Sequence, residues 1–241
     1  ILSSFNYKKF KKNNKKDFLK KLSPVYDAIK ITRKKLNKKK SLISFVGAPW
    51  TLFVYMSGLK KSKKKISTYN FKKNNKVIAC LTDYICLHIE KQIQAGANVV
   101  QIFDSWAGLI PQQHLLEYCY LPNKKIVSFC KKKRIPVICF PKGIKRKYYD
   151  FNKIVKPDGL NIDYDIDPEW AKRNLKNTSL QGGMDPKILL GSKKKILKEA
   201  KRYMDVFKNV PYIFNLGHGL LPSTDPRKLK MLINFIRKYK C

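Results

Sequence analysis

Short apolar runs alternate along the chain with longer segments of helical periodicity. Between the runs, apolar residues recur at three- and four-residue steps, most clearly from Ile78 to Ile93, and Gly96 ends that pattern. Strands that alternate with helices in this way predict a parallel sheet in an α/β fold. The run Tyr212–Leu216 is predicted to be a buried strand. All the runs that we interpret as strands are Leu42–Val46, Val99–Phe103, Pro136–Phe140, Gly159–Ile162, Ser179–Gln181 and Tyr212–Leu216.

Three helix starts carry the pair Asp-Pro, at Asp167-Pro168, Asp185-Pro186 and Asp225-Pro226. Aspartate accepts hydrogen bonds from the free amides of a first helical turn, and proline suits the first helical position. We therefore predict a helix after each pair. Residues 1–41 form a Lys-rich segment before the first strand. This segment is predicted to be helical, with an apolar face formed by Phe18, Leu22, Tyr26 and Ile29.

Glycines and polar residues follow every predicted strand, whereas the opposite strand ends carry ordinary linkers. Such an asymmetry is typical of the active face of a β/α barrel. A doubly wound sheet would carry a G-x-G-x-x-G turn after its first strand, and the turn at Gly47 has one glycine. His218, between Gly217 and Gly219, is predicted on this face and close to a ligand. The segments are GAPWT (47–51), DSWAG (104–108), PKG (141–143), DYDID (163–167), GGMDP (182–186) and GHG (217–219).

Composition places the chain among globular proteins, with 241 residues and 44% hydrophobic residues. Its longest apolar run, 42–56, is broken by Gly47 and Pro49 and is shorter than the roughly 18 residues of a membrane span. The net charge is +37, which fits nucleic-acid binding, a Lys-rich proteome or a polyanionic small substrate. The lysines fall in scattered runs such as Lys63–Lys65 and Lys193–Lys195, and no nucleic-acid-binding motif accompanies them. We therefore expect no nucleic-acid partner and no membrane association.

The side chains that commonly bind metals do not form a metal motif. Cys80, 86, 119, 130, 139 and 241 lack C-x-x-C spacing and are expected to be buried thiols in a reducing compartment. Asp163, Asp165 and Asp167 imitate a calcium loop, but Pro168 occupies the position that needs glycine. We instead predict that Asp163 ends a strand and that Asp167 caps a helix.

Two further histidines and one serine have side chains that could bind a ligand or take part in catalysis. His88 lies within the apolar helix and is expected to be a half-buried surface histidine without a chemical role, whereas the role of His114 stays open. Ser105 lacks the G-x-S-x-G elbow of a hydrolase nucleophile, so we predict that its hydroxyl donates to a ligand.

Several long segments in sequence order carry a family resemblance that extends from about Tyr26 to the end. They are VGAPWTLFVYM (46–56), QIFDSWAG (101–108), GLNIDYDID (159–167), LQGGMDP (180–186) and FNLGHGLLPSTDP (214–226). Together they resemble the successive signatures of uroporphyrinogen decarboxylases.

This resemblance implies a single domain over residues 1–241 with a distorted (β/α)8 TIM-type barrel, usually a homodimer. It implies cofactor-free and metal-free removal of carbon dioxide from the four acetate side chains of uroporphyrinogen III, giving coproporphyrinogen III. The family's substrate contacts correspond to Tyr55, Ser105 and His218. Its arginine-rich signature and its pyrrole-binding aspartate, which is not Asp104, are not found. Because the chain starts at Ile1, we expect the barrel to be incomplete at its N-terminus, with catalytic residues upstream and little activity in these residues alone.

Two alternatives remain at this point. Corrinoid-dependent methyltransferases have a related barrel and bind zinc through a His-x-Cys motif, but Val137 stands here two residues before Cys139. A basic nucleic-acid-binding module is the other alternative. The cytoplasm and a plastid stroma both fit the expected thiols.

Overall fold

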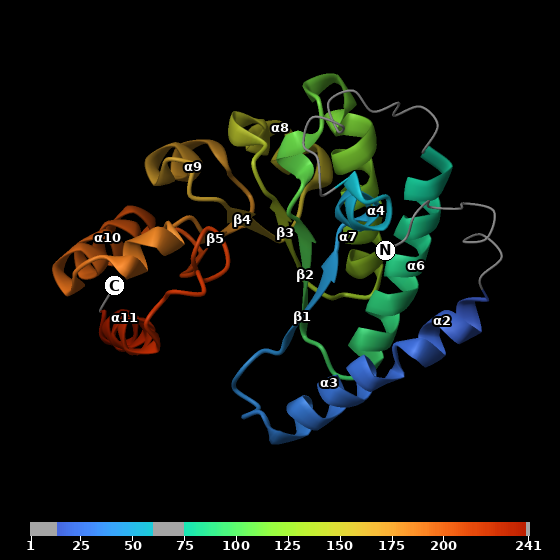
Figure 1. Ribbon diagram of the computed structural model, residues 1–241, viewed down its shortest axis with the longest axis horizontal. Coiled ribbons are helices and arrows are strands. Elements are labelled where there is room, and N and C mark those ends of the chain that lie inside the picture. The colour runs from blue at the N-terminus through green and yellow to red at the C-terminus, as the bar shows by residue number, and fades with distance from the viewer. Residues whose placement is uncertain (1–13, 60–74, 240–241) are drawn as a thin grey trace.

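A computed structural model describes residues 14–59 and 75–239 of the protein. It contains a six-stranded, fully parallel sheet in the order β1-β2-β3-β4-β5-β6 (Figure 1). All six strands lie where the apolar runs predicted them. The strands are β1 (Ile43–Gly47), β2 (Val99–Asp104), β3 (Val137–Pro141), β4 (Gly159–Ile162), β5 (Ser179–Gly182) and β6 (Tyr212–Ile213).

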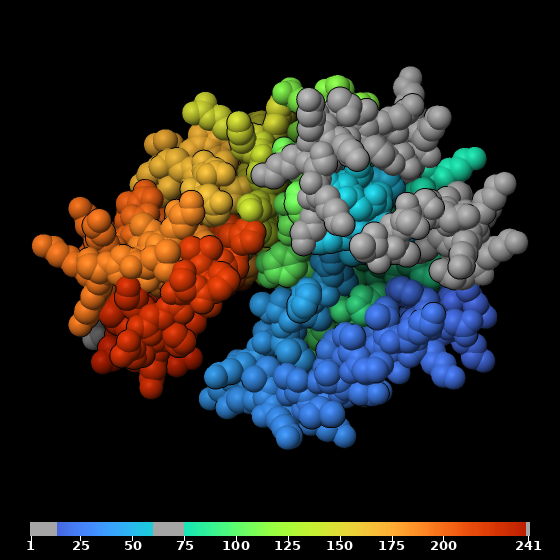
Figure 2. All heavy atoms as spheres, in the orientation of Figure 1, coloured from blue at the N-terminus to red at the C-terminus, as the bar shows by residue number. Residues whose placement is uncertain are grey.

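Each strand pairs with the strand that precedes it in the sequence, without a reversal of direction along the sheet. A doubly wound sheet contains such a reversal, whereas a β/α barrel does not. Within the described residues, β1 and β6 each pair along one edge only, so the sheet is an open arc. Figure 2 shows a hollow between the C-terminal helix and the segment around β1.

Helices cover the outer side of this arc (Figure 1). The predicted apolar helix is α6, and Ile78, Leu81, Ile85 and Ile89 are buried along it. Gly96 follows that helix with a φ of 110°, a conformation that favours glycine. The α-helices are α2 (Lys15–Lys21), α3 (Ser23–Lys35), α4 (Pro49–Met56), α6 (Asn75–Gln94), α7 (Leu121–Lys132), α8 (Tyr148–Val155), α9 (Pro168–Asn174), α10 (Lys193–Phe207) and α11 (Pro226–Lys238). Shorter 3₁₀ turns are Ala107–Leu109, Gln112–His114, Lys145–Lys147 and Pro186–Leu190, and Leu116–Tyr120 is a π-helical turn.

The three Asp-Pro pairs all cap helices, but of two kinds. Asp167 accepts a hydrogen bond from the Trp170 amide at 2.8 Å and begins α9, and Asp225 caps α11 in the same way. Asp185 instead begins the 3₁₀ helix Pro186–Leu190. That short helix ends at Gly191, and α10 starts anew after Ser192, whose side chain provides the next cap.

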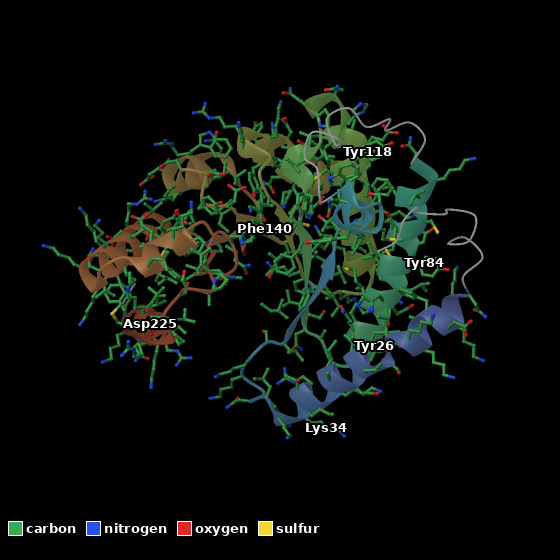
Figure 3. All side chains as sticks on the ribbon, viewed as in Figure 1. Tyr26, Lys34, Tyr84, Tyr118, Phe140 and Asp225 are labelled. Atoms are coloured by element: carbon green, nitrogen blue, oxygen red, sulfur yellow. The ribbon has the colours of Figure 1, made fainter. Side chains whose placement is uncertain are left out.

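The helices before β1 pack on α6. Phe18 of α2 meets Tyr84 edge-to-face at 4.9 Å between ring centroids. The Tyr26 hydroxyl of α3 lies 3.0 Å from Nδ1 of His88, and Figure 3 shows Tyr26 and Tyr84 at this junction. His88 is half-buried, as predicted. The apolar face expected for one helix is divided between two. Leu22 lies at the junction, after the last residue of α2, and Pro24 lies in the first turn of α3.

The main core lies between the sheet and its helices. The five residues in register across the sheet on this side, from β1 to β5, are all at most 5% exposed. They are Val46, Ile102, Cys139, Leu160 and Leu180.

The opposite, inner side of the sheet changes character across the arc. Phe45, Phe103 and Phe140 form an aromatic row with centroid distances of 5.8 and 6.2 Å. Phe140 on β3 is labelled in Figure 3. Phe45 is 66% exposed, because β1 is an edge strand within the described residues. Farther along, the Gln181 side-chain amide donates to Asn161 at 2.7 Å.

The strand predicted at Tyr212–Leu216 is shorter and less buried than expected. Only Tyr212 and Ile213 form a ladder with β5, and Leu216 forms an isolated bridge with Met184. Ile213 is 42% exposed, because β6 has a strand on one side only within the described part of the chain. The expectation of a fully buried strand was therefore wrong here. The Lys63–Lys65 run and Cys241 lie outside the described residues.

Candidate functional site

The first part of the rim joins α4 to the segment after β2. The Thr51 hydroxyl of α4 donates to Oδ1 of Asp104 at 2.8 Å and accepts from the Trp106 amide at 3.3 Å. The Trp50 indole N–H donates to the Trp106 carbonyl oxygen at 3.1 Å. These bonds fix the turn that contains Ser105, which is half-buried. Tyr55, one helical turn after Thr51, is 50% exposed and meets Trp106 edge-to-face at 6.2 Å.

Asp104 is the buried anchor of this part. Its side chain is 1% exposed, and burial raises its pKa to about 6, although hydrogen bonds from Thr51 and Asn123 partly oppose the shift. The side-chain amide of Asn123 donates to Oδ2 of Asp104 at 3.3 Å and to the Cys119 carbonyl oxygen at 2.8 Å. The Asp104 carboxylate is therefore buried, with both oxygens in hydrogen bonds to the protein. It positions the rim and is not exposed to a ligand.

The segments after β2 and β3 touch through glycines. The Gly108 amide donates to the Lys142 carbonyl oxygen at 2.8 Å. A Cβ at Gly108 would lie 2.6 Å from the Gly143 carbonyl oxygen, so only glycine fits there. The Gly143 amide, at a φ of 82°, donates to Oδ2 of Asp163 at 2.6 Å. The two segments are thereby fixed to the end of β4.

Asp163 ends β4, as predicted, and its two oxygens are occupied by the protein. Oδ2 also accepts from the Tyr148 hydroxyl at 3.3 Å, and Oδ1 accepts from the Asp165 amide at 3.2 Å. Burial raises the pKa of Asp163. Asp167 caps α9, so these aspartates organise backbone and do not form a calcium loop.

His218 follows β6 on the same rim and is exposed. Its Nδ1 accepts from the Gly219 amide at 2.7 Å, which leaves the ring proton of a neutral imidazole on Nε2. Partial burial lowers the His218 pKa and the nearby Lys142 lowers it further, while the Gly219 amide and Asp163 oppose the shift. The imidazole is therefore mainly neutral at pH 7 and presents an N–H donor.

The two glycines beside His218 differ. The Gly217 amide donates to the Met184 carbonyl oxygen at 2.8 Å, and a Cβ at Gly217 would lie 2.5 Å from the Tyr164 nitrogen. A Cβ at Gly219 would meet nothing within 4 Å. Gly217 is thus packed against the protein, whereas Gly219 borders open space, and the expected close approach to a ligand stays a prediction.

The rim therefore has two clusters, and the predicted residues divide between them. Tyr55 on α4 meets the turn after β2 that contains Ser105, whereas His218 follows β6 and lies near Lys142 and Asp163. Lys142 was not singled out from the sequence, although the segment PKG was noted. Its ammonium lies over the Tyr164 ring, 5.9 Å from the centroid.

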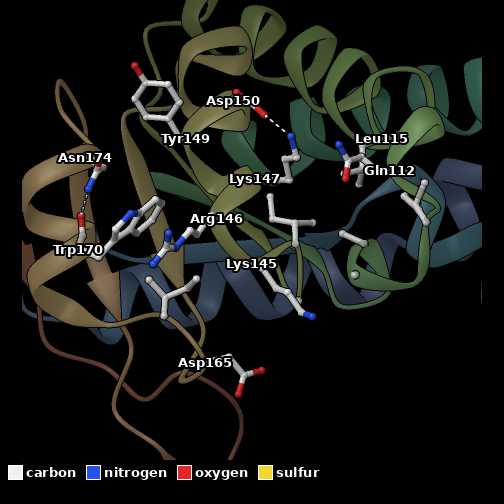
Figure 4. A pocket seen from close by; sticks show the side chains of 16 residues that line it. Gln112, Leu115, Lys145, Arg146, Lys147, Tyr149, Asp150, Asp165, Trp170 and Asn174 are labelled. Carbon is white, nitrogen blue, oxygen red and sulfur yellow. Dashed lines mark hydrogen bonds and ion pairs between the residues drawn. The ribbon is translucent and has the colours of Figure 1, made fainter.

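Two hollows border the rim. A groove of about 1020 Å³ lies outside it and shares Gly108, Gly143 and Asp165 with the segments described above (Figure 4). A smaller hollow of about 450 Å³ contains His218 together with apolar side chains of α11. The outer groove also contains Gln112, Lys145, Arg146, Tyr149, Trp170 and Asn174.

The cysteines do not form a site on this rim. Cys86, Cys119, Cys130 and Cys139 are buried as predicted, and Cys80 is half-buried. Cys139 lies on the helix side of β3, away from the inner face, and burial raises its pKa. Across residues 14–59 and 75–239, no three His, Cys, Asp or Glu side chains are close enough to hold a metal ion. No helix in these ranges is long and apolar enough to span a membrane.

Residues 2–239 match the model of the family described as uroporphyrinogen decarboxylase (URO-D). The chain belongs to the uroporphyrinogen decarboxylase family. It is 41% identical over 228 residues to the uroporphyrinogen decarboxylase of Orientia tsutsugamushi (strain Boryong), an alignment that covers 91% of this chain and 66% of the relative. The enzyme of the same name from Wolbachia pipientis wMel is 38% identical, with 90% and 65% covered. The chain thus spans just under two thirds of the length of these relatives.

Two solved structures with other names share the fold of this chain. A methyltransferase from Methanosarcina mazei superposes with a TM-score of 0.72 at 19% identity, covering 89% of this chain and 63% of that one. A B12-independent methionine synthase from Shewanella sp. W3-18-1 gives 0.62 at 11%, with 88% and 66% covered. At such identities the likeness concerns the fold alone. Together with the sequential parallel sheet, it confirms the predicted β/α-barrel fold of this uroporphyrinogen decarboxylase family member.

Proposed function

We propose that this protein is a carboxy-lyase that converts uroporphyrinogen III to coproporphyrinogen III by removing the carboxyl groups of four acetate side chains. The observation that carries the proposal is the rim at the carboxyl ends of the strands. Tyr55, Ser105 and His218, which correspond to the family's substrate contacts, all lie on that rim, on segments that follow three different strands. Family membership and identities of 41% and 38% to named decarboxylases support the same assignment.

The proposed chemistry draws its electron sink from the substrate. Protonation of a pyrrole carbon gives an iminium cation, which accepts the electron pair of the breaking bond as carbon dioxide leaves. A proton delivered to the exocyclic methylene carbon then completes the methyl group, and loss of the proton from the ring carbon restores the pyrrole. The protein has to bind the remaining carboxylates and to hold the ring in place.

The residues of the rim suit carboxylate binding. His218 presents a neutral N–H donor on Nε2, and the Tyr55 phenol and the Ser105 hydroxyl are further donors. Asp104 and Asp163 are occupied by the hydrogen bonds described above, so we assign neither as the acid that protonates the pyrrole. The proposal therefore names substrate-binding residues and leaves the proton donor unassigned.

The assembly and location belong to the same proposal. We take residues 1–241 as belonging to one domain, because α2 and α3 pack on α6, which connects β1 with β2. A homodimer without cofactor is the form that the family resemblance implies. The cytoplasm or a plastid stroma is the proposed location, which the buried free thiols and the bacterial relatives support.

The test uses uroporphyrinogen III under anaerobic conditions with the full-length protein, with the products oxidised and separated by carboxyl number. His218→Ala removes a hydrogen bond to a charged group, worth about 1.5–3 kcal/mol, which lowers kcat/KM by roughly 10- to 150-fold. His218→Gln keeps an N–H donor and is expected to recover part of the loss. Thermal unfolding of each variant is the control.

Three results would count against the proposal. The absence of coproporphyrinogen III from the wild-type reaction contradicts the activity. A His218→Ala variant that unfolds but retains its activity per folded molecule shows a packing role. Complete loss of turnover with unchanged substrate binding indicates a proton-transfer role in place of carboxylate binding.

A further inference from the structure

Lys142 is held rigidly at the centre of the rim. It directly follows β3, and its amide donates to the carbonyl oxygens of Asp104 and Phe140, each at 3.1 Å. Its own carbonyl oxygen accepts from the Gly108 amide at 2.8 Å. The backbone is therefore bound on both sides, so the direction in which the side chain leaves the strand is fixed.

Among the described residues, no carboxylate forms an ion pair with the Lys142 ammonium group. The Lys142 side chain is half-buried, and within residues 14–59 and 75–239 it forms no ion pair. The nearby Asp163 already accepts hydrogen bonds from Gly143, Tyr148 and Asp165. The ammonium group is therefore available to pair with an anion that binds from outside.

Two neighbouring rings define where such an anion would bind. The face of Tyr164 supports the ammonium at 5.9 Å, which restricts the flexible lysine stem. His218 lies beside the same tyrosine, because a Cβ at the adjacent Gly217 would lie 2.5 Å from the Tyr164 backbone nitrogen, and the Lys142 charge lowers the His218 pKa. That charge favours the neutral imidazole, whose free N–H is on Nε2.

We infer that Lys142 and His218 together bind one carboxylate of the substrate. The ammonium provides the charge, the Nε2 N–H provides the directional hydrogen bond, and Lys142 keeps His218 neutral in the donor form that the bond requires. The inference rests on the proposed function and deepens it, because it assigns a carboxylate site to a pair of residues from β3 and β6.

The test compares Lys142→Met with Lys142→Arg, which keeps the cation, and with Lys145→Met. Lys145 is an exposed lysine three residues later that borders the outer groove, and it serves as the matched control. The probes are uroporphyrin III, an octacarboxylate, and coproporphyrin III, a tetracarboxylate. The binding of each probe is measured by the quenching of tryptophan fluorescence. The pKa of His218 is measured by NMR in the same proteins without a probe.

The expected result has three parts. Lys142→Met weakens uroporphyrin III binding about tenfold, the lower end for a charged hydrogen bond at a half-exposed site, and reduces its salt dependence. Lys142→Arg restores most of the affinity, and Lys145→Met changes it little. The His218 pKa rises in Lys142→Met only, because the neighbouring positive charge is gone.

The outcomes separate this inference from the proposed function. If Lys142→Met binds both porphyrins as tightly as wild type, the inference fails, whatever the turnover. If the binding falls while the His218 pKa is unchanged, the pairing of the two residues is wrong. If the wild-type protein does not decarboxylate uroporphyrinogen III but the binding falls as expected, the carboxylate site stands and the proposed activity fails. A loss of binding that Lys142→Arg does not restore, with lowered thermal stability, marks Lys142 as structural and overturns the inference.

Discussion

The buried carboxylate of Asp104 makes a sharp prediction about stability and pH. In the folded protein burial raises its pKa to about 6, from a usual value of 3.8. Between these two values the folded state binds more protons than the unfolded state, so stability falls as the pH rises. The ionised group therefore costs stability above pH 6, and acidification from pH 7 towards pH 5 relieves part of that cost.

The magnitude follows from the shift. A raised pKa of about two units corresponds to roughly 3 kcal/mol of lost stability at pH 7, at 1.36 kcal/mol per unit. Between pH 7 and pH 5 the linkage relation returns about 1.3 kcal/mol of this cost. Asp104→Asn removes the titration but keeps a similar shape and one acceptor for the Thr51 hydroxyl. The difference in unfolding free energy between wild type and variant is therefore expected to move by about 1.3 kcal/mol in favour of the wild type at pH 5.

The assay is urea unfolding followed by circular dichroism at pH 5, 6 and 7. Asp163 and the surface carboxylates occur in both proteins, so their titration cancels in the difference. Asp83→Asn, which removes an exposed carboxylate from the same chain, controls for the loss of one acidic charge against a net charge of +37. A wild-type-minus-variant difference that stays constant from pH 7 to pH 5 would show that Asp104 titrates at its usual pKa and refute the reasoning.

Two further predictions concern the rim and the surface. Gly217→Val is expected to reduce kcat/KM at least as much as His218→Ala, because the valine side chain would displace the backbone at Tyr164. Gly219→Ala is expected to retain activity, because its side chain would extend into open space. Equal losses of kcat/KM in the two glycine variants, measured in the porphyrinogen assay, would contradict this geometry. Lys193 and Lys194 are exposed at the positive N-terminal end of α10. Replacing both by Glu is expected to raise the unfolding free energy by about 0.3–1 kcal/mol per residue at low salt and to leave turnover nearly unchanged. A large loss of turnover would place this lysine run in the active site.

Much of the fold was predictable because it depends on local patterns. The six strands and α6 were located from apolar periodicity, and the helix starts from Asp-Pro pairs. The errors arose where a neighbour decides the outcome. Tyr212–Leu216 has the composition of a buried strand, yet Ile213 is exposed because no strand covers its outer edge in the described residues.

The site was predictable to a different extent. The family resemblance identified His218, but the sequence did not distinguish Gly217 from Gly219, since crowding depends on the backbone of Tyr164. Lys142 was overlooked for a related reason. It is one of 53 basic residues, and only the structure shows a lysine with a fixed backbone, an aromatic support and no ion pair among the described residues.

The sequential order of the sheet has a consequence for how the chain is made. Each strand pairs with the one translated just before it, as Val100 does with Val137 and Gly159 with Ser179. The polypeptide emerges from the ribosome at roughly 5–20 residues per second, far more slowly than helices form and chain loops close. Every new strand therefore meets a partner that is already outside the ribosome, and the sheet can grow by one strand at a time. The emerging edge is then the site most exposed to wrong pairing, and it moves along the chain as synthesis proceeds.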